Sequence, residues 1–267
     1  MSSEERSHIP LVQKLAIESA AAIAAAALVS PFISIIDVSI FSNASGRQKL
    51  GSAIVSGFKK LTFHPIQFCK HPSFYLIWGV YSGTYIVANT IQAFCDHKHI
   101  PWFYPKFVGT SVANVGLSVL KDLYLTRTFG TGQVRKVPFR SYSLYTIRDS
   151  LTIYASFNLP TILSQNLVAS GIDPKWADVG AQLVTPCAIQ LSSSPLHLLG
   201  MDFYNRPQAS TPDRVVFIKK EYFATTLARI GRIFPAYGIG GVANKYFRKL
   251  GSEWLDQMHS KKQMAMV

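Results

Sequence analysis

Two oppositely charged residues stand side by side in a run that is otherwise uncharged and rich in aromatic residues. The run is SLYTIRDSLTIYASFNLP, residues 143–160, and the pair is Arg148 and Asp149. A guanidinium can bind a carboxylate through two parallel hydrogen bonds, and a carboxylate beside it can bind an amino group. The pair therefore has the chemistry to hold a zwitterion.

A structural role for the pair is the alternative. Neighbouring residues on a helix point in different directions, so we do not expect the two charges to be each other's best partners. Residues on other segments could pair with them instead: Lys121, Asp122 or Arg229. Pairing of this kind, or mutual neutralisation, would explain both charges without a ligand.

The composition indicates a basic membrane protein. Of the 267 residues, 48% are hydrophobic and only 15% are charged, whereas a soluble domain typically has about 25% charged residues. Lys and Arg number 27 against 14 Asp and Glu. We expect the lipid bilayer, including anionic lipids such as cardiolipin, to be a partner, and we expect no nucleic acid.

The sequence contains no convincing catalytic or metal-binding pattern. The residues of a hydrolase triad, a zinc protease or a dinucleotide site cannot be assembled with meaningful spacing. The three cysteines lie far apart, and the cluster CDHKH at residues 95–99 lacks a fourth metal ligand. We therefore expect no enzyme, no metal and no cofactor.

Six largely uncharged runs approach the length of about 20 residues that a helix needs to cross a bilayer. They are Ser19–Ile36, Pro72–Cys95, Phe107–Leu120, Ser141–Ser164, Val179–Met201 and Phe223–Asn244. The third, fourth and sixth runs reach membrane length only with charged residues inside them, and these charges must face the interior of a bundle because a charge in lipid is costly. The alternative is a soluble all-helical protein with long buried helices, which the modest mean hydropathy of +0.18 leaves open.

The connecting segments predict the topology. Basic residues are concentrated after the first, third and fifth runs, so both termini should lie on the opposite face. The same alternation of long and short connections predicts three helix pairs in one domain, residues 1–267, with repeats at about 12–103, 104–174 and 175–254 and a polar tail at 255–267. Two connections should form short amphipathic helices, one over QKLGSAIVSGFKKL and one around residues 215–222.

This organisation resembles the mitochondrial carrier family, whose members fold three such repeats into a six-helix barrel around a central cavity. The residues that carry the resemblance are Pro31 and Pro195 near the ends of two runs, LYTIRDSLTIYASF in the fourth and LARIGRIFPAYGIG in the sixth. The family signature of a proline, an acid and a base is degenerate here. Only Asp122 and Arg127 stand in their places in the second copy.

The resemblance implies a fold, a location and a site. The implied fold is that of an all-α membrane protein. The implied mechanism is alternating access, and the implied location is the mitochondrial inner membrane, with the outer membrane as the alternative. Substrate contacts would come from the even-numbered runs, and the gate or helix kinks from the signature positions. The implied contacts are Arg148, Asp149, Arg232, Tyr81 and Thr84, and the implied gate or kink residues are Pro31, Asp122, Arg127 and Pro195.

Two functions are compatible with this architecture. The first is transport of a small carboxylate or an amino-acid-type metabolite. The second is a non-transporting scaffold or a membrane-insertion or organising protein, which the missing signature charges favour. Arg148, Asp149 and Arg232 favour transport.

Overall fold

The computed structural model describes residues 10–131 and 136–264, and these residues form helices and connections without a strand. The helices are α1 (Leu11–Ala44), α2 (Leu50–Phe63), α3 (Pro65–Cys69), α4 (Pro72–His97), α5 (Phe103–Phe129), α6 (Phe139–Phe157), α7 (Leu159–Ala169), α8 (Pro174–Asn205), α9 (Thr211–Ile233), the π-helical segment η2 (Phe234–Gly241) and α10 (Val242–Met264). The predicted all-α class is confirmed.

Several helices begin at residues suited to a first turn. Pro72 and Pro174 open α4 and α8, where the missing N–H of proline interrupts no helical bond. The side chain of Asp173 accepts a hydrogen bond from Lys175 N at the start of α8. At α9, Ser210 and Asp213 form a capping box, in which each side chain binds the backbone N–H of the other residue.

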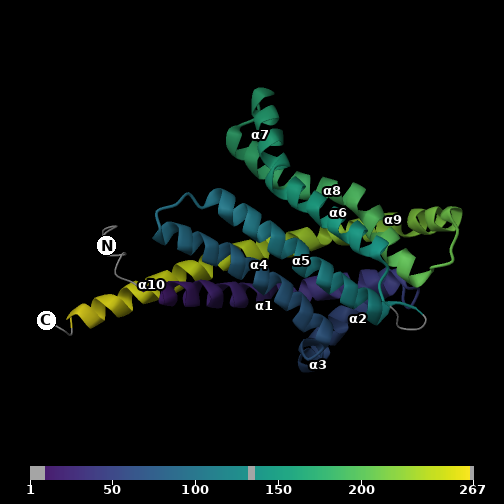
Figure 1. The fold of residues 1–267 in the computed structure, drawn as a ribbon, viewed down its shortest axis with the longest axis horizontal. Helices are drawn as coiled ribbons and strands as arrows, with labels where there is room; N and C mark the ends of the chain where they lie inside the picture. The colour runs from purple at the N-terminus through teal and green to yellow at the C-terminus, as the bar shows by residue number, and fades with distance from the viewer. Residues whose placement is uncertain (1–9, 132–135, 265–267) are drawn as a thin grey trace.

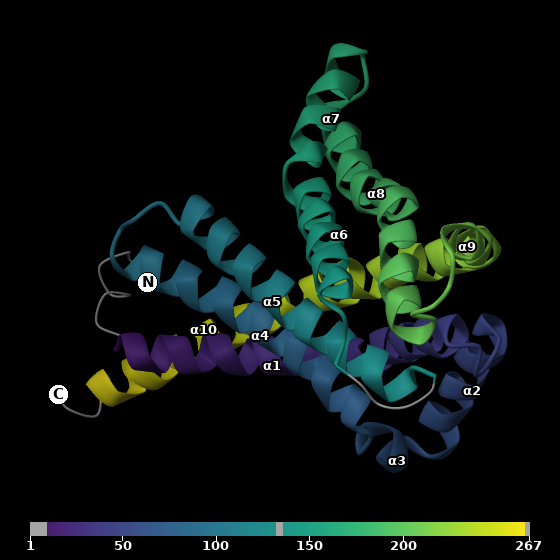
Figure 2. The ribbon, with the colours of Figure 1, turned by 45° about the vertical axis from the view of Figure 1, so that its right-hand side comes forward.

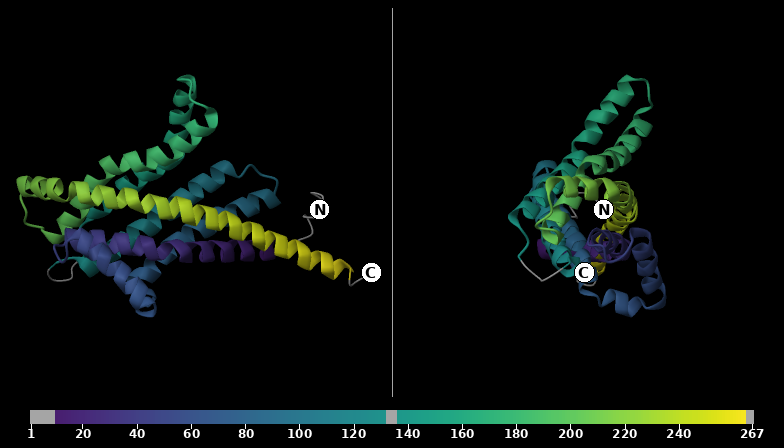
Figure 3. Two further views of the ribbon diagram at one scale, coloured as in Figure 1. Left: turned by 180° about the vertical axis from the view of Figure 1, so that it is seen from behind. Right: turned by 90° about the vertical axis from the view of Figure 1, so that its right-hand side faces the viewer.

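The helices converge at one end of the molecule and spread at the other. α1 lies beside α4 and α10 along much of its length, and α9, η2 and α10 form one long rod (Figures 1 and 3). The α4–α5 hairpin packs on α1, whereas α7 and the first half of α8 project away from that body (Figure 2). α7 packs against α8 and α6, so this part of the chain has few other helices beside it.

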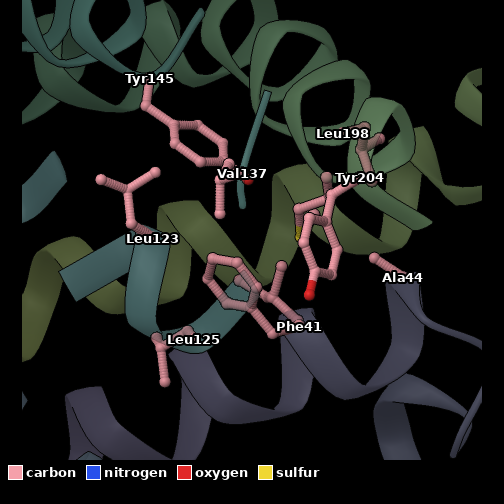
Figure 4. Packing of buried hydrophobic residues seen from close by; sticks show 10 residues of the cluster. Phe41, Ala44, Leu123, Leu125, Val137, Tyr145, Leu198 and Tyr204 are labelled. Atoms are coloured by element: carbon pink, nitrogen blue, oxygen red, sulfur yellow. The ribbon is translucent and has the colours of Figure 1, made fainter. Parts of the chain in front are cut away.

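An apolar cluster fills the converging end. It joins α1, α5, α6 and α8 through large buried side chains, several of which are seen in Figure 4. The buried members are Ile40, Phe41, Ala44, Leu123, Leu125, Val137, Tyr145, Leu198, Met201 and Tyr204. Burial of this many apolar groups makes the converging end the main hydrophobic core of the described chain.

The close approach of α6 and α8 depends on a glycine. A methyl group added at Gly200 would lie 2.6 Å from Cε1 of Tyr145, a ring that is fully buried. The hydroxyl of Ser141 also donates to the Gly200 carbonyl oxygen, at 2.7 Å. The two helices are therefore held at a separation that leaves no room for a side chain at position 200.

Gly200→Ala should lower the free energy of unfolding by about 1–3 kcal/mol, because overpacking a filled core forces side chains or backbone to move. Gly180→Ala is the matched control on the same helix, since nothing lies within 4 Å of the added methyl group. This control should be neutral or more stable by about 0.5–1 kcal/mol, because alanine favours a helix. Thermal unfolding in detergent compares the two, and equal midpoints would contradict the packing.

The six predicted runs all fall in helices, but two are interrupted. Ser141–Ser164 is divided between α6 and α7 at Asn158, and Phe223–Asn244 passes through η2. Within the described residues one helix, α1, is long and apolar enough by its own composition to cross a membrane, with a mean hydropathy of 2.1 in its best window. The six-span barrel and its three repeats therefore stay predictions.

The predicted connections have mixed outcomes. α2 begins at Leu50 and ends at Phe63, which confirms a separate helix in the first connection. The second expected helix, around residues 215–222, is instead an internal part of α9, because the capping box starts a helix that no proline stops before Pro235. α1 begins and α10 ends at one end of the molecule, while α1, α5 and α8 all end at the other (Figure 1).

Candidate functional site

Charged side chains from four helices meet beside the apolar cluster. We call this set the ion-pair layer: Asp37 of α1, Lys121 and Asp122 of α5, Arg148 and Asp149 of α6, and Arg232 of α9. The first five are buried, and the Arg232 side chain is 21% exposed. Charges so removed from water must be paired, which explains why they gather in one place.

Arg148 is the best-connected residue of the layer. Its Nε lies 3.0 Å from Asp149 Oδ1, and its Nη2 lies 2.7 Å from Asp149 Oδ2 and also binds Asp122. Its Nη1 lies 2.5 Å from Nδ1 of His197 on α8. Arg148 and Asp149 therefore do pair, because the long arginine side chain folds back to reach both carboxylate oxygens, and Asp122 is a second partner of Arg148, as the structural alternative allowed.

Asp37 joins α1 to two other helices. Its Oδ2 lies 2.5 Å from Lys121 Nζ, and its Oδ1 lies 2.7 Å from Arg232 Nη1. Lys121 also lies 2.8 Å from Asp122 Oδ1, which continues the layer to Arg148. A single chain of ion pairs thus runs from α9 through α1 and α5 to α6.

The ion-pair layer lies directly on the apolar cluster. Phe41 is one turn beyond Asp37 on α1 and meets the His197 ring edge to face, at 5.1 Å between centroids. Tyr145 lies one turn before Arg148, whose guanidinium carbon is 5.1 Å from the centre of its ring. The Tyr145 hydroxyl in turn lies 2.9 Å from Thr126 Oγ1. Polar and apolar contacts therefore close the same end of the bundle together.

Arg229 lies outside the chain of ion pairs. It is 2% exposed, and its hydrogen-bond partners are neutral groups of α8. Its Nε donates to Gln190 Oε1 at 3.0 Å, and its Nη2 donates to Ser193 Oγ at 3.2 Å. Among residues 10–131 and 136–264, no carboxylate lies within ion-pair distance of Arg229.

The other predicted site residues are not members of the ion-pair layer, although Tyr81 on α4 interacts electrostatically with Arg232. On α4, Thr84 is buried and donates to Val80 O at 2.8 Å, and the ring of Tyr81 lies 6.3 Å from that of Tyr85. Pro31 and Pro195 lie inside α1 and α8, which both continue past them as helices. Arg127 is exposed on α5. The structure thus brings together Arg148, Asp149, Arg232 and Asp122 from the predicted set.

Asp37, Lys121 and His197 complete the layer, although sequence reasoning did not select them as site residues. A signal for Asp37 existed, since it is the only acidic residue between Glu18 and Asp96. Lys121 was visible at the end of an uncharged run. Nothing in the sequence pointed to His197, because its partners come from two other helices.

A second polar group joins helices at the opposite end. Arg248 of α10 binds Glu18 of α1 and lies 3.2 Å from Gln92 Oε1 of α4, which also accepts from Lys106 Nζ at 2.8 Å. The side chains of Asn89 and Asn244 bind each other through both amides, at 2.9 and 3.0 Å. We call this set the distal polar group.

The two polar sets are separated by an uncharged stretch of α1. From Glu18 to Asp37, at a rise of about 1.5 Å per residue, the separation along the helix is about 28 Å. This length is close to the hydrocarbon thickness of a bilayer, about 30 Å. The charges of α1 therefore stand at the two levels where a membrane-spanning helix would carry them.

The cavities found in the described chain lie away from the layer. One of about 250 Å³ lies between α7 and α8 and is lined by Pro160, Thr161, Ser164, Gln165, Asp178 and Gln182. A second, of about 40 Å³, lies beside Glu18 and Arg248. Neither of these two cavities is lined by a residue of the ion-pair layer.

Comparison with known proteins gives one family. A family model described as a probable citrulline exporter matches residues 21–251, which is most of the chain. No curated protein matches the chain. The resemblance to mitochondrial carriers was wrong, because the matching family is a different one. Its supporting features, paired helices and interior prolines, are general features of helical membrane proteins, while the specific charge signature is absent from two of the three copies.

Proposed function

Because the chain belongs to the family of probable citrulline exporters, we propose that it moves citrulline or a similar amino-acid-type metabolite across a membrane by alternating access. The family description supports a transporter rather than an enzyme. A transporter needs a bundle that is closed at one end while the other is accessible. The observation that carries the proposal is such an asymmetry: the ion-pair layer and apolar cluster join the helices at one end, whereas α7 and the first half of α8 project away from the other helices (Figure 2).

The distribution of charge supports six membrane crossings. Six stretches of the helices are free of Asp, Glu, Lys and Arg: 19–36, 71–95, 107–120, 150–172, 179–201 and 233–244. The third and sixth are shorter than a crossing of about 20 residues and must be extended by flanking polar residues. Several of these helices are too polar to cross alone, but their polar residues can face the bundle interior rather than lipid. We propose that the ion-pair layer and the distal polar group lie near the two surfaces of the membrane.

We propose that the ion-pair layer is the gate of the closed end. Opening this end requires Asp37 to release Lys121 and Arg232, and Arg148 to release Asp122. A zwitterion can compensate for these losses, since its carboxylate can bind an arginine and its amino group can bind Asp149. A ligand that binds the open arrangement better than the closed one shifts the equilibrium by that difference in affinity.

We extend this proposal to the remaining predicted residues on α1, α4 and α8. Tyr81 and Thr84 on α4 are proposed to line the path, with Arg232 at the layer. Pro31 and Pro195 are proposed as points where α1 and α8 bend during opening, because an interior proline removes a helical hydrogen bond. The mitochondrial inner membrane, with the outer membrane as the alternative, stays a predicted location that fractionation of the organelle would test.

Exchange of labelled citrulline by the purified protein in liposomes tests the transport proposal. Vesicles loaded with unlabelled citrulline should take up external labelled citrulline faster than vesicles without protein, and internal citrulline should accelerate the uptake. A panel of amino acids, keto acids and other carboxylates would define the substrate range. Uptake no faster than that of protein-free vesicles for every compound would contradict transport.

A non-transporting scaffold or membrane-insertion protein is the second candidate. The observation that favours it is the pairing of Arg148 and Arg232 with protein carboxylates, which accounts for both charges without a ligand. Under this alternative the charges only hold α1, α5, α6 and α9 together. Stability would then depend on the layer while citrulline had no effect on thermal unfolding.

A further inference from the structure

Arg229 is a buried cation whose charge the described chain does not balance. With the ion-pair layer it makes a set of four cations and three carboxylates: Lys121, Arg148, Arg229 and Arg232 against Asp37, Asp122 and Asp149. All three carboxylates are already paired with the other three cations. An isolated charge in an apolar interior is unfavourable, so the excess cation calls for an anion from outside the chain.

The guanidinium of Arg229 also retains hydrogen-bonding capacity. Of its five N–H groups, one on Nε and one on Nη2 bind Gln190 and Ser193. The hydrogen bonds found for Arg229 in the described part of the chain come from Nε and Nη2 and none from Nη1. The remaining donors lie in the fork geometry that suits a carboxylate.

Buried hydroxyl groups without partners stand on the same helix face. Thr225 and Thr226 lie four and three residues before Arg229 on α9 and are 1% and 3% exposed. Neither hydroxyl has a hydrogen-bond partner among the residues that the structure describes. A buried hydroxyl left unpaired is unfavourable, and both can donate to an anionic oxygen.

The position of this set suits a substrate that enters beside the projecting part of α8. α8 supplies Gln190 and Ser193, and its first half projects with α7 away from the other helices (Figure 2). His197, two turns beyond Gln190 on α8, already belongs to the ion-pair layer through its contact with Arg148. Along α8, the residues that bind Arg229 therefore come before the residue that contacts the ion-pair layer.

We infer that Arg229, assisted by Thr225 and Thr226, is the first binding site for the carboxylate of the transported amino acid. Arg148 and Arg232 are occupied by protein carboxylates in the closed bundle, whereas Arg229 is not. The inference rests on the proposed transport function and deepens it, because it makes a carboxylate, rather than the ureido group of citrulline, the primary feature that is recognised.

Competition by citrulline and its carboxamide tests this site. In liposomes containing the wild-type protein, unlabelled citrulline should inhibit uptake of labelled citrulline at least tenfold better than citrullinamide. In Arg229→Met the two compounds should inhibit with similar potency, and KM for citrulline should rise at least tenfold. Arg229→Lys, which keeps the charge without the fork, should retain part of the preference. Lys220→Met, an exposed position on α9, should behave as wild type.

Each outcome separates this inference from the transport proposal. Thermal unfolding should show Arg229→Met to be at least as stable as wild type, since the substitution removes an uncompensated charge. If wild type transports citrulline and stable Arg229→Met keeps the full preference for the acid, the carboxylate site is wrong and transport stands. If wild type transports none of the compounds, both proposals are wrong. A strong loss of stability in Arg229→Met and Arg229→Lys would assign the arginine to structure alone.

Discussion

Replacing Asp37 with alanine should lower the free energy of unfolding by about 3–5 kcal/mol, the range found when one partner of a buried ion pair is removed. Asp37 is 3% exposed and binds both Lys121 and Arg232. Its removal leaves Arg232 without its carboxylate and Lys121 with Asp122 alone, and it breaks the ion pair between α1 and α9. Unfolding of the detergent-purified protein, followed by circular dichroism, measures the loss.

A double substitution separates loss of pairing from loss of packing. In Asp37→Ala with Arg232→Ala, the arginine that would lose its partner is also removed and Lys121 still binds Asp122, so the double variant should be more stable than the sum of the two single losses predicts. Additive losses would show that the Asp37–Arg232 contact contributes no coupling. Glu253→Ala is the control for a surface carboxylate, since its ion pair with Lys249 is largely exposed and should contribute at most about 1 kcal/mol.

The sequence allowed the helical class and the positions of most helices to be predicted. Uncharged runs of membrane length are uncommon in loops, so α1, α4, α5 and α8 were found by length and composition. The break between α6 and α7 was missed because only charges were used to delimit that run. Pro160 lies just after the break and carries the signal, since proline belongs in the first turn of a new helix.

The π-helical segment η2 has a comparable local cause. Its sequence, FPAYGIGG, combines Pro235 with three glycines, which weaken regular helical hydrogen bonding and favour an irregular turn. The composition of the run predicted a continuous helix. Whether it forms α-helical or π-helical turns depends on the packing of η2 against α1 and α9. Such a choice depends on neighbours that are distant in the sequence.

The candidate site was predictable only in part, because it too depends on neighbours that are distant in the sequence. A charge pair within an uncharged run is a visible anomaly, and Arg148 and Asp149 do lie in the ion-pair layer. Their partners Asp122 and His197 come from α5 and α8, and only the packing of these helices brings them within hydrogen-bonding distance. Residue types and spacing therefore indicated that a buried polar site exists, but not which groups satisfy one another.

Exchanging the charges of Asp122 and Arg148 should have the largest effect on transport. Arg148→Asp alone places three carboxylates together, those of positions 122, 148 and 149, and Asp122→Arg alone places two guanidinium groups together. Each single variant should reduce citrulline exchange at least a hundredfold, because repulsion in a site of low dielectric prevents the closed end from forming. Initial rates in liposomes, normalised to the amount of folded protein, measure the effect.

The double variant distinguishes a gate from a binding contact. If the pair acts only by closing the bundle, Asp122→Arg with Arg148→Asp restores opposite charges at the same distance and should recover a substantial part of the exchange rate. If Arg148 must also bind the substrate carboxylate, the double variant should regain thermal stability without regaining exchange, because the guanidinium now projects from α5. Recovery of neither property would show that the contact between Arg148 and Asp122 does not hold the bundle closed. Since Arg148 also binds Asp149 and His197, we expect stability to recover more fully than transport.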